Sequence, residues 1–530
     1  MKNIKKTAII SIAILLLLGT SILAACETEL LPLEVPYDLS SYEYVFEKEY
    51  FFDDYNDRHS SASYGIDVFE KETKEVVFES LTYERLVGLL ESEGSYLILL
   101  GGSWCHNTRA EAELINKYAL ENDIHTIYNF DFRLDGTNSS SHVRETNNAS
   151  SKNAGVQFNY LYGELVSRYL TNLTDWVEYS NGSKSSANYT NASGEVVNVA
   201  KVQVPFLFLY NKDNTVRNVP TRSEDLVAWH NQTGIHTEDG EQGKTYPIVY
   251  GFEEMVDRDE GGIYYSVNRV KTYDTEAFSQ RIKGVFDYIT KEKIQLSTYS
   301  NADYIREFYN KKSGKTIFEK DDQINIHTIT YRQLIWLLEE EGNALILFGG
   351  SWCPNTQAVI ATINDYAVAN NLIIYNFDTK LDSGYANANW GYEKDAHIRD
   401  SANPFVKLYT DLVETYLPNI ETLYDKNSSQ AYQYISYAAN GEEVRVNKLQ
   451  VPYLLAYNKD AKADNGVEPA PITAYYEEML TISDSAAADY VYASDNYARY
   501  KAGVYKVIQT YFDREESGIV AREITVDRAK

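Results

Sequence analysis

Apolar positions along the chain follow two periods in a fixed order, which predicts alternating helices and buried strands. Helical spacing comes first, then a continuous apolar run, then helical spacing again and a second apolar run. The residues are Leu86, Leu89 and Leu90, then Tyr96–Leu100, then Ala112, Ile115 and Ala119, then Ile124–Phe130. Because parallel strands need a long crossover between them, this order predicts an α/β fold with parallel strand pairing.

The whole pattern occurs twice. The segment Leu97–Thr108 reads LILLGGSWCHNT and returns 248 residues later as Leu345–Thr356, LILFGGSWCPNT. The constant order and nearly constant spacing indicate a duplicated domain and not a short solenoid repeat. Further matching blocks are Thr82–Gly94 with Thr330–Gly342, Tyr128–Asp131 with Tyr375–Asp378, and Gln203–Asp213 with Gln450–Asp460. The boundary between the copies is expected between Lys291 and Thr298.

Weaker patterns complete each copy. A strand is expected at Val204–Leu209, because a proline is tolerated at the first residue of a strand. Further helices are expected at Tyr160–Leu173, Glu276–Ile289, Phe405–Leu417 and Tyr500–Phe512. The segments Arg133–Ala200 and Lys380–Asn447 are rich in Asn, Ser, Gly and Tyr, and we expect loops with some helix there. Gly94 and Gly342 follow helical patterns and are expected to cap them.

The N-terminus has the pattern of an export signal. Three lysines within the first six residues precede the uncharged apolar run Ala8–Ala25, and Cys26 follows directly. The end of this run resembles the lipobox of bacterial lipoproteins. The resemblance implies a signal peptide over 1–25 and a tether over 26–42, anchored to the extracytoplasmic face of the cell membrane by diacylglycerol and palmitate-like acyl chains on Cys26. An uncleaved membrane-spanning helix is the alternative, since the run is just long enough to span.

Size and charge narrow the class of protein. The 530 residues exceed one ordinary core, so we place two domains at 43–294 and 295–530. The formal charge of −28 argues against nucleic acid as a partner, because phosphates would be repelled. The chain has 46 tyrosines. Exposed tyrosines contact sugars or peptides, whereas buried ones reflect composition and β-rich packing.

Cysteine usage gives the candidate chemistry. The chain has three cysteines, Cys26, Cys105 and Cys353, which are too few for the disulfide scaffold of an exported protein. Cys105 and Cys353 occupy matching positions, where a strand pattern ends and a helical pattern begins. The sequence has no zinc-ligand spacing and no phosphate-binding loop, so no metal and no cofactor are expected.

These marks resemble the thioredoxin fold. In each copy a buried strand runs into Trp-Cys at a helix start, and a later Val-Pro opens a strand. The resemblance implies two tandem thioredoxin-like domains, each a mixed central sheet flanked by helices, with long loop insertions. It also implies a cis-proline beside each active cysteine. The implied substrate-binding residues are Trp104, Thr108, Val204 and Pro205, with Trp352, Thr356, Val451 and Pro452 in the second copy.

The same resemblance implies thiol chemistry at Cys105 and Cys353. Unpaired N–H groups and the helix dipole stabilise a thiolate at a helix N-terminus and make it a nucleophile for disulfides. Where related oxidoreductases have a second cysteine, this chain has Thr108 and Thr356, whose hydroxyls are placed to donate to the thiolate. A mixed disulfide therefore needs an outside thiol to resolve it. This departure favours monothiol disulfide exchange or thiol capture, with extracytoplasmic thiol or disulfide proteins as partners.

Two functional hypotheses stay open. One is a surface thiol–disulfide protein, for which Cys105 is expected to be partly exposed at a helix start beside Pro205. The other is a non-catalytic thioredoxin-like module that binds peptides or glycans at the cell surface through tyrosine-rich loops. In that case each cysteine is a small buried hydrophobe.

Three further features recur in both copies. His142–Arg144 and His397–Arg399 are either a base or anion contact at the site or, as we prefer, a helix start with solvated charge. The segment Glu253–Met255 matches Glu477–Met479 and is interpreted as a helix face. The family's buried carboxylate, six residues before the cysteine, falls on Leu99 and Leu347. The acid/base aid to the chemistry of a resolving thiol is therefore missing, which is consistent with the absence of a resolving thiol.

Overall fold

The computed structural model describes only part of the chain. The described residues are 39–58, 67–73, 75–136, 141–146, 158–177, 179–180, 183–184, 186–190, 195–221, 234–253, 276–384, 395–422, 433–437, 442–463, 465–477 and 495–516. The expected signal peptide, Cys26 and most of the expected tether lie outside these residues. Within the described residues, no helix combines the length and the apolar character needed to cross a membrane.

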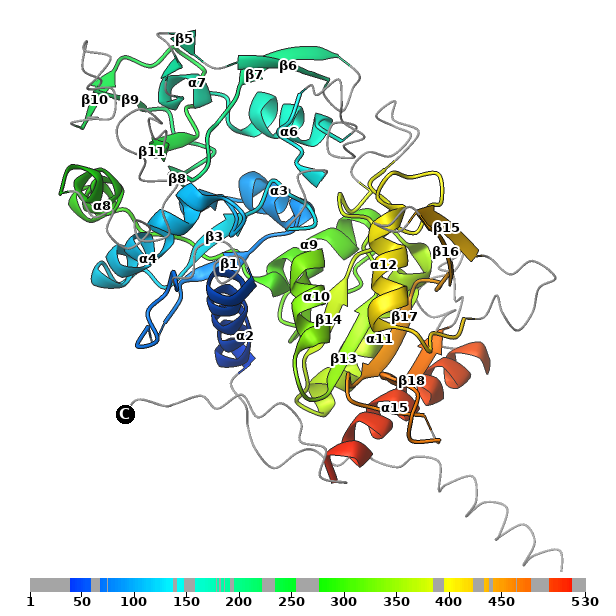
Figure 1. Ribbon diagram of the computed structural model, residues 1–530. Coiled ribbons are helices and arrows are strands. Elements are labelled where there is room, and N and C mark those ends of the chain that lie inside the picture. The colour runs from blue at the N-terminus through cyan, green and yellow to red at the C-terminus, as the bar shows by residue number, and fades with distance from the viewer. Residues whose placement is uncertain are drawn as a thin grey trace, which may run out of the picture.

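Each copy has one five-stranded mixed sheet (Figure 1). The orders are β1-β3-β2-β8-β11 and β12-β14-β13-β17-β18. The first three strands in each order are parallel, as the sequence pattern predicts, and the last two are antiparallel to their neighbours. The first sheet contains β1 (Phe78–Ser80), β2 (Tyr96–Leu100), β3 (Ile127–Phe130), β8 (Phe206–Tyr210) and β11 (Ile248–Glu253). The second contains β12 (Ile326–Ile329), β13 (Ala344–Phe348), β14 (Ile374–Phe377), β17 (Tyr453–Tyr457) and β18 (Ile472–Glu477).

Helices pack against these sheets, which gives a mixed α/β architecture. The helices of the first copy include α3 (Tyr83–Glu91), α4 (His106–Glu121) and α8 (Glu276–Lys291); those of the second include α10 (Tyr331–Glu339), α11 (Pro354–Ala369) and α15 (Asp495–Glu516). In the first copy α8 packs against α4 and the strands β8 and β11. In the second copy α15 packs in the same way against α11, β17 and β18. The central strands β2 and β13 are buried along their whole length.

The starts of α3 and α10 follow from threonine caps. The side chain of Thr82 accepts a hydrogen bond from the N–H of Arg85, and Thr330 forms a capping box with Gln333. The expectation that Gly94 caps α3 is wrong, because the helix ends at Glu91 with Ser92 as its C-cap. Gly94 instead has φ of +126° in the turn that leads into β2, a conformation that favours glycine.

The insertions contain strands as well as the expected helix. The two-stranded sheets there are β4 (Tyr179–Ser180) with β5 (Ser183–Lys184), β6 (Ser186–Thr190) with β7 (Val196–Ala200), and β15 (Gln433–Tyr437) with β16 (Glu443–Asn447). Further along, β9 (Arg217–Pro220) pairs with β10 (Ile235–Glu238). Where one helix was expected at Tyr160–Leu173, the chain forms α6 (Tyr160–Glu164), the π-helix η4 (Leu165–Tyr169) and α7 (Leu173–Trp176). The counterpart α12 (Val406–Tyr416) is continuous.

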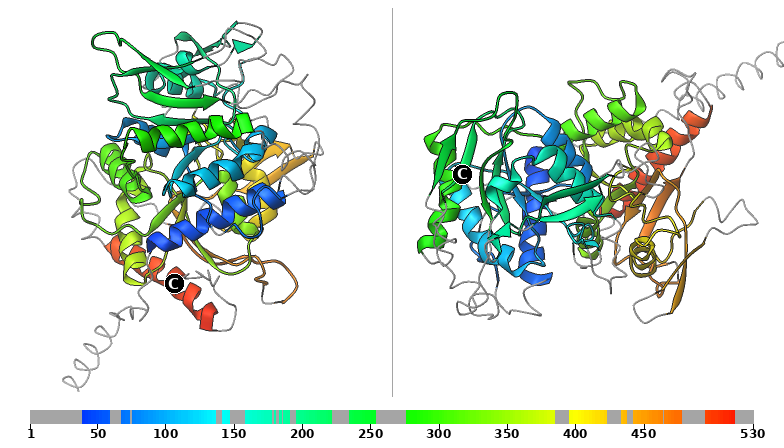
Figure 2. Two further views of the ribbon diagram at one scale, coloured as in Figure 1. Left: turned by 90° about the vertical axis from the view of Figure 1, so that its left-hand side faces the viewer. Right: turned by 90° about the horizontal axis from the view of Figure 1, so that it is seen from above.

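Two equivalent helices tie the copies together (Figures 1 and 2). The helix α2 (Leu39–Asp53), followed by the π-helix η2 (Asp54–Arg58), begins within the expected tether and lies beside β1. Its Phe46 ring lies 5.2 Å from His327, 5.2 Å from Trp336 and 4.7 Å from Tyr375, between ring centres, all in the second copy. The helix α9 (Asn301–Ser313) lies beside β12 and packs against α3 of the first copy. Each copy thus contributes a helix to the surface of the other.

Candidate functional site

Both cysteines lie at the start of a helix, as the sequence predicts. Cys105 is the N-cap of α4 and Cys353 is the N-cap of α11, with nearly identical backbone angles of −89° and 116° against −88° and 116°. A tight turn joins each cysteine to the preceding buried strand. The N–H of Cys105 donates to the oxygen of Gly102 at 3.0 Å, and the N–H of Cys353 donates to the oxygen of Gly350 at 3.0 Å. The two turns are therefore the same structure built twice.

Each sulfur lies beside a cis-proline. The peptide bonds Val204–Pro205 and Val451–Pro452 are cis. The Sγ of Cys105 lies 3.5 Å from the oxygen of the first valine, and the Sγ of Cys353 lies 3.6 Å from the oxygen of the second. The expected partial exposure of Cys105 is wrong, however. Cys105 is 7% exposed and Cys353 is 5% exposed, so both thiols are buried.

The tryptophan before each cysteine is held by a carboxylate from a neighbouring strand. Trp104 Nε1 donates to Asp131 Oδ1 at 2.7 Å, and Trp352 Nε1 donates to Asp378 Oδ1 at 2.8 Å. The guanidinium of Arg133 stacks 3.8 Å from the centre of the Trp104 ring, and a lysine takes the same place in the second copy. Strand, tryptophan and cysteine are in this way fixed together.

These two carboxyl groups lie deep in the protein. Burial raises the pKa of Asp131 and of Asp378 to about 7, although the indole N–H and a backbone N–H act to lower it. Gly102 and Gly350 make room for them, since a Cβ at either position would collide with the carboxylate. The sequence predicts no acid at the position of Leu99 and Leu347. The structure instead brings Asp131 and Asp378, which follow the neighbouring strands, to the tryptophans that precede the cysteines. In the sequence, these carboxylates are indicated by the repeated block Tyr128–Asp131, which ends in the aspartate in both copies.

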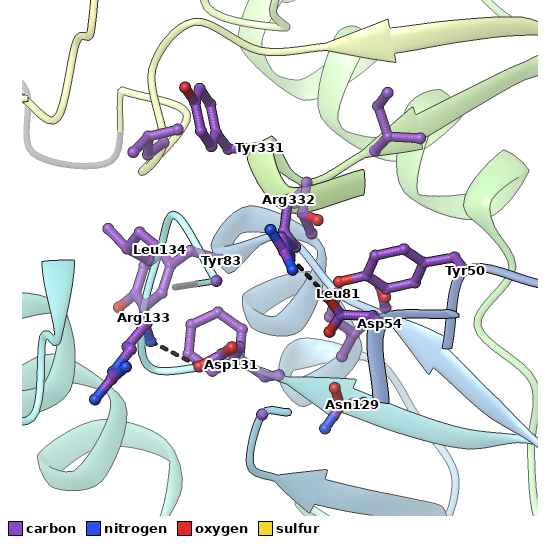
Figure 3. Close-up of a pocket in the computed structure, with 18 of the residues that line it drawn as sticks. Tyr50, Asp54, Leu81, Tyr83, Asn129, Asp131, Arg133, Leu134, Tyr331 and Arg332 are labelled. Atoms are coloured by element: carbon purple, nitrogen blue, oxygen red, sulfur yellow. Dashed lines mark hydrogen bonds and ion pairs between the residues drawn. The ribbon is translucent and has the colours of Figure 1, made fainter. Parts of the chain in front are cut away.

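A small cavity lies between the copies (Figure 3), and Gly102 and Ser103 of the first cysteine turn are among the residues that line it. Its volume is about 60 Å³, room for a few water molecules but far below the roughly 300 Å³ of a typical small-molecule pocket. Asp131 and Asp378 both line it. Arg332 of the second copy donates from Nε to Asp54 Oδ1 of the first copy at 2.7 Å. Neither cysteine lines the cavity, so it gives no access to a thiol.

Comparisons with known proteins return weak structural neighbours and no family. No family model matches the sequence, and no curated protein matches it. Among solved structures, crystal form II of ERdj5 is 7% identical with a TM-score of 0.15, over 63% of this chain and 28% of that chain. Form I of ERdj5 is 9% identical with a TM-score of 0.14, over 81% of this chain and 30% of that chain. The matches span less than a third of the length of ERdj5.

The histidines of the repeated His-X-Arg motifs lie against the tryptophans. The ring centre of His142 is 5.0 Å from that of Trp104, and the ring centre of His397 is 5.5 Å from that of Trp352. Both histidines form short β-bridges, so the preferred interpretation as a solvated helix start is wrong. Burial above all, and nearby cationic side chains, lower the pKa of both rings to about 2, and both are neutral at pH 7.

Buried charged side chains hold the backbone just before each cis-proline. The contacts are Arg144 Nη1 with the Val202 oxygen, Arg399 Nη1 with the Leu449 oxygen, the Gln203 N–H with Glu253 Oε1 at 2.6 Å, and the Gln450 N–H with Glu477 Oε1 at 2.5 Å. Glu253 and Glu477 end the strands β11 and β18, so the interpretation as a helix face is wrong. Because these glutamates recur in both copies, the repeat in the sequence indicates that they have the same structural role.

The threonines at the position of the usual second cysteine pack inward. Thr108 and Thr356 are fully buried, and neither hydroxyl has a hydrogen-bond partner among the described residues. The expected hydrogen bond to the sulfur is therefore absent from this part of the chain. Each threonine instead lies against the glycine that ends the strand, Gly101 or Gly349, where a Cβ would be too close.

Proposed function

We propose that the chain is a membrane-anchored extracytoplasmic lipoprotein with two tandem thioredoxin-like domains, acting by monothiol disulfide exchange or thiol capture. The observation that carries the proposal is one thiol geometry built twice. In each copy a helix N-cap cysteine follows a buried parallel strand, and its sulfur lies 3.5 Å or 3.6 Å from the carbonyl before a cis-proline. The strand order shared by both sheets supports the thioredoxin-like assignment.

The residues around each sulfur have separate parts in this proposal. The first N–H groups of a helix have no acceptor within that helix, so the starts of α4 and of α11 present donors to negative charge that develops on the sulfur. Trp104 and Trp352, each bonded to a buried aspartate, fix the turn that carries the cysteine. The segments Val204–Pro205 and Val451–Pro452 border the sulfur atoms and meet the backbone of a partner that approaches them.

The exchange step begins with the Cys105 thiolate, which attacks one sulfur of a partner disulfide. A new S–S bond forms to Sγ while the partner's own S–S bond breaks. The leaving sulfur departs as a thiolate and takes a proton from water, so Cys105 is oxidised and the leaving sulfur is reduced. Because Thr108 provides no second thiol, the mixed disulfide persists until an outside thiolate attacks it. Cys353 and Thr356 follow the same scheme.

Incubation of the full chain with oxidised glutathione tests the proposal. We expect mass spectrometry to find glutathione on Cys105 and on Cys353, stable until dithiothreitol is added. Cys105→Ser and Cys353→Ser should each remove one adduct and leave the other. If the folded chain forms no adduct at either cysteine while the urea-unfolded chain does, the proposal fails.

Thr108→Cys tests the monothiol part. A thiol placed three residues after Cys105 should attack the mixed disulfide and release glutathione, leaving an internal disulfide. The Cys353 adduct in the same molecule should persist and serves as the control. An adduct at Cys105 that is equally stable in the variant and in the unaltered chain would contradict this scheme.

One observation favours the alternative, a non-catalytic thioredoxin-like module that binds peptides or glycans. Both thiols are buried, as a small structural hydrophobe would be. The tyrosines weigh against sugar contacts, however, since none of those whose burial is described is exposed. Within the described residues, the alternative therefore rests on the burial of the cysteines.

A further inference from the structure

Glu84 belongs to the first copy, but its carboxylate is bonded to the second. It lies in α3 and is 0% exposed. The hydroxyl of Tyr304 donates to its Oε2 at 2.7 Å, and the hydroxyl of Ser351 donates to the same oxygen at 2.9 Å. The Nζ of Lys312 forms an ion pair with Oε1. A buried carboxylate is costly without such partners, so this cluster holds the copies in one arrangement.

Ser351 connects this cluster to the second thiol. It lies in the turn before α11, two residues ahead of Cys353. Its side chain donates to Glu84, while its backbone oxygen accepts a hydrogen bond from Gln357 Nε2 of α11 at 2.6 Å. The charge of Glu84 also contributes to raising the pKa of Asp378, which holds the tryptophan between Ser351 and Cys353. Glu84 therefore acts both on the serine of this turn and on the aspartate that holds its tryptophan.

Among the residues that the structure describes, the first copy has no matching arrangement. The repeat offset of 248 residues aligns Glu84 with Arg332, whose guanidinium pairs with Asp54. The same offset aligns Ser351 with Ser103, whose hydroxyl has no hydrogen-bond partner among the described residues. The two cysteine turns are alike in backbone geometry but are supported differently across the interface.

We propose that Glu84 is a positioning residue for the Cys353 site: by holding Ser351 it fixes the turn of the second copy, so that the reactivity of Cys353, and not that of Cys105, depends on the neighbouring copy. The inference deepens the proposed thiol function, on which it rests. It predicts that any movement of α3 relative to the second copy changes the exposure of Cys353.

Alkylation of the full chain with iodoacetamide tests this, with the rate at each cysteine read separately by peptide mass spectrometry. Ser351→Ala should raise the Cys353 rate about three- to tenfold, because the turn loses a hydrogen bond to a charged group. The Cys105 rate in the same molecule should not change. The matched control Ser103→Ala removes a hydroxyl with no described partner and should change neither rate.

Glu84→Gln tests the carboxylate itself. It should raise the Cys353 rate, as Ser351→Ala does, because a neutral amide oxygen is a weaker acceptor for the Ser351 hydroxyl and forms no ion pair with Lys312. The Cys105 rate should again stay unchanged. If a variant raises the alkylation rates of Cys105 and Cys353 together, it has lowered the stability of the whole protein and the proposal is overturned. An unchanged Cys353 rate in Ser351→Ala would overturn it as well. These rate differences are independent of glutathione adduct formation, so this inference and the proposed function fail separately.

Discussion

At the scale of residues, the carboxyl groups of Asp131 and Asp378 fix the tryptophan in each cysteine turn. Each accepts from the indole of the tryptophan that precedes the cysteine. The pairs Trp-Cys and Val-Pro are each contiguous in sequence, so the helix start at the cysteine and the strand after the proline are predicted from the pattern. The aspartates, the neutral histidines and Glu84 escape such an analysis, because their charge state and partners arise only from packing between distant segments.

Asp131→Asn tests the buried carboxyl group. The folded-state pKa of about 7 lies above the ordinary value of 3.8, so the folded chain retains a proton that the unfolded chain has lost between these values. This contribution to stability is fully present below about pH 4 and is lost as the pH rises through 7. In the variant, the fall in unfolding free energy from pH 5 to pH 8 should be smaller by about 2 kcal/mol, measured by urea unfolding.

The exposed position Asp213 provides the control for that measurement. Asp213→Asn should leave the pH dependence as it is in the unaltered chain, because its side chain is 68% exposed. If Asp131→Asn has the same pH dependence as the Asp213→Asn variant, Asp131 does not titrate in the way described here.

At the scale of elements, continuous apolar runs are easy to assign and polar strands are not. The strands β2 and β13 appear where the pattern predicts them, because every residue in them is buried. The hairpin of β6 and β7 lies in a region expected to be loop and helix, because β6 is rich in polar residues and eight of the ten residues of the hairpin are at least partly exposed. The helix α2 begins inside the expected tether, since its aromatic residues pack against a copy nearly 300 positions away in sequence.

Phe46→Ala tests the contact of α2 with the second copy. The ring is buried among His327, Trp336 and Tyr375, so its removal leaves a cavity. We expect a loss of about 3–5 kcal/mol in unfolding free energy, followed by tryptophan fluorescence in urea. Val196→Ala, at a side chain that is 70% exposed, should change stability by less than about 0.5 kcal/mol. Equal effects of the two substitutions would contradict the packing of α2 described here.

At the scale of the whole molecule, duplication has produced two sites that are alike in backbone and different in their surroundings. The sequence predicts the duplication and the matched cysteines directly, because both are visible as aligned blocks. It does not predict how α2 and α9 join the copies, or that Glu84 and Arg332, at the same repeat position, carry opposite charges into the interface. Contacts between copies depend on surfaces that no single block of the repeat contains.

The proposed membrane anchor is tested on the full chain in a bacterial host. We expect a clickable palmitate analogue to label the protein and to label Cys26→Ser not at all, since the acyl chains require that thiol. The variant should also leave the membrane fraction. A Cys26→Ser protein that stays in the membrane would instead support an uncleaved spanning segment.

The central claim is that the duplicated geometry makes these thiols chemically active. The most direct test is the rate at which iodoacetamide alkylates Cys105 and Cys353 in the native full chain at pH 7, compared with a cysteine in an unstructured peptide. The account predicts that at least one of the two reacts faster than the peptide thiol, despite its burial. If both react more slowly than the peptide, the thiols are structural and the claim is contradicted.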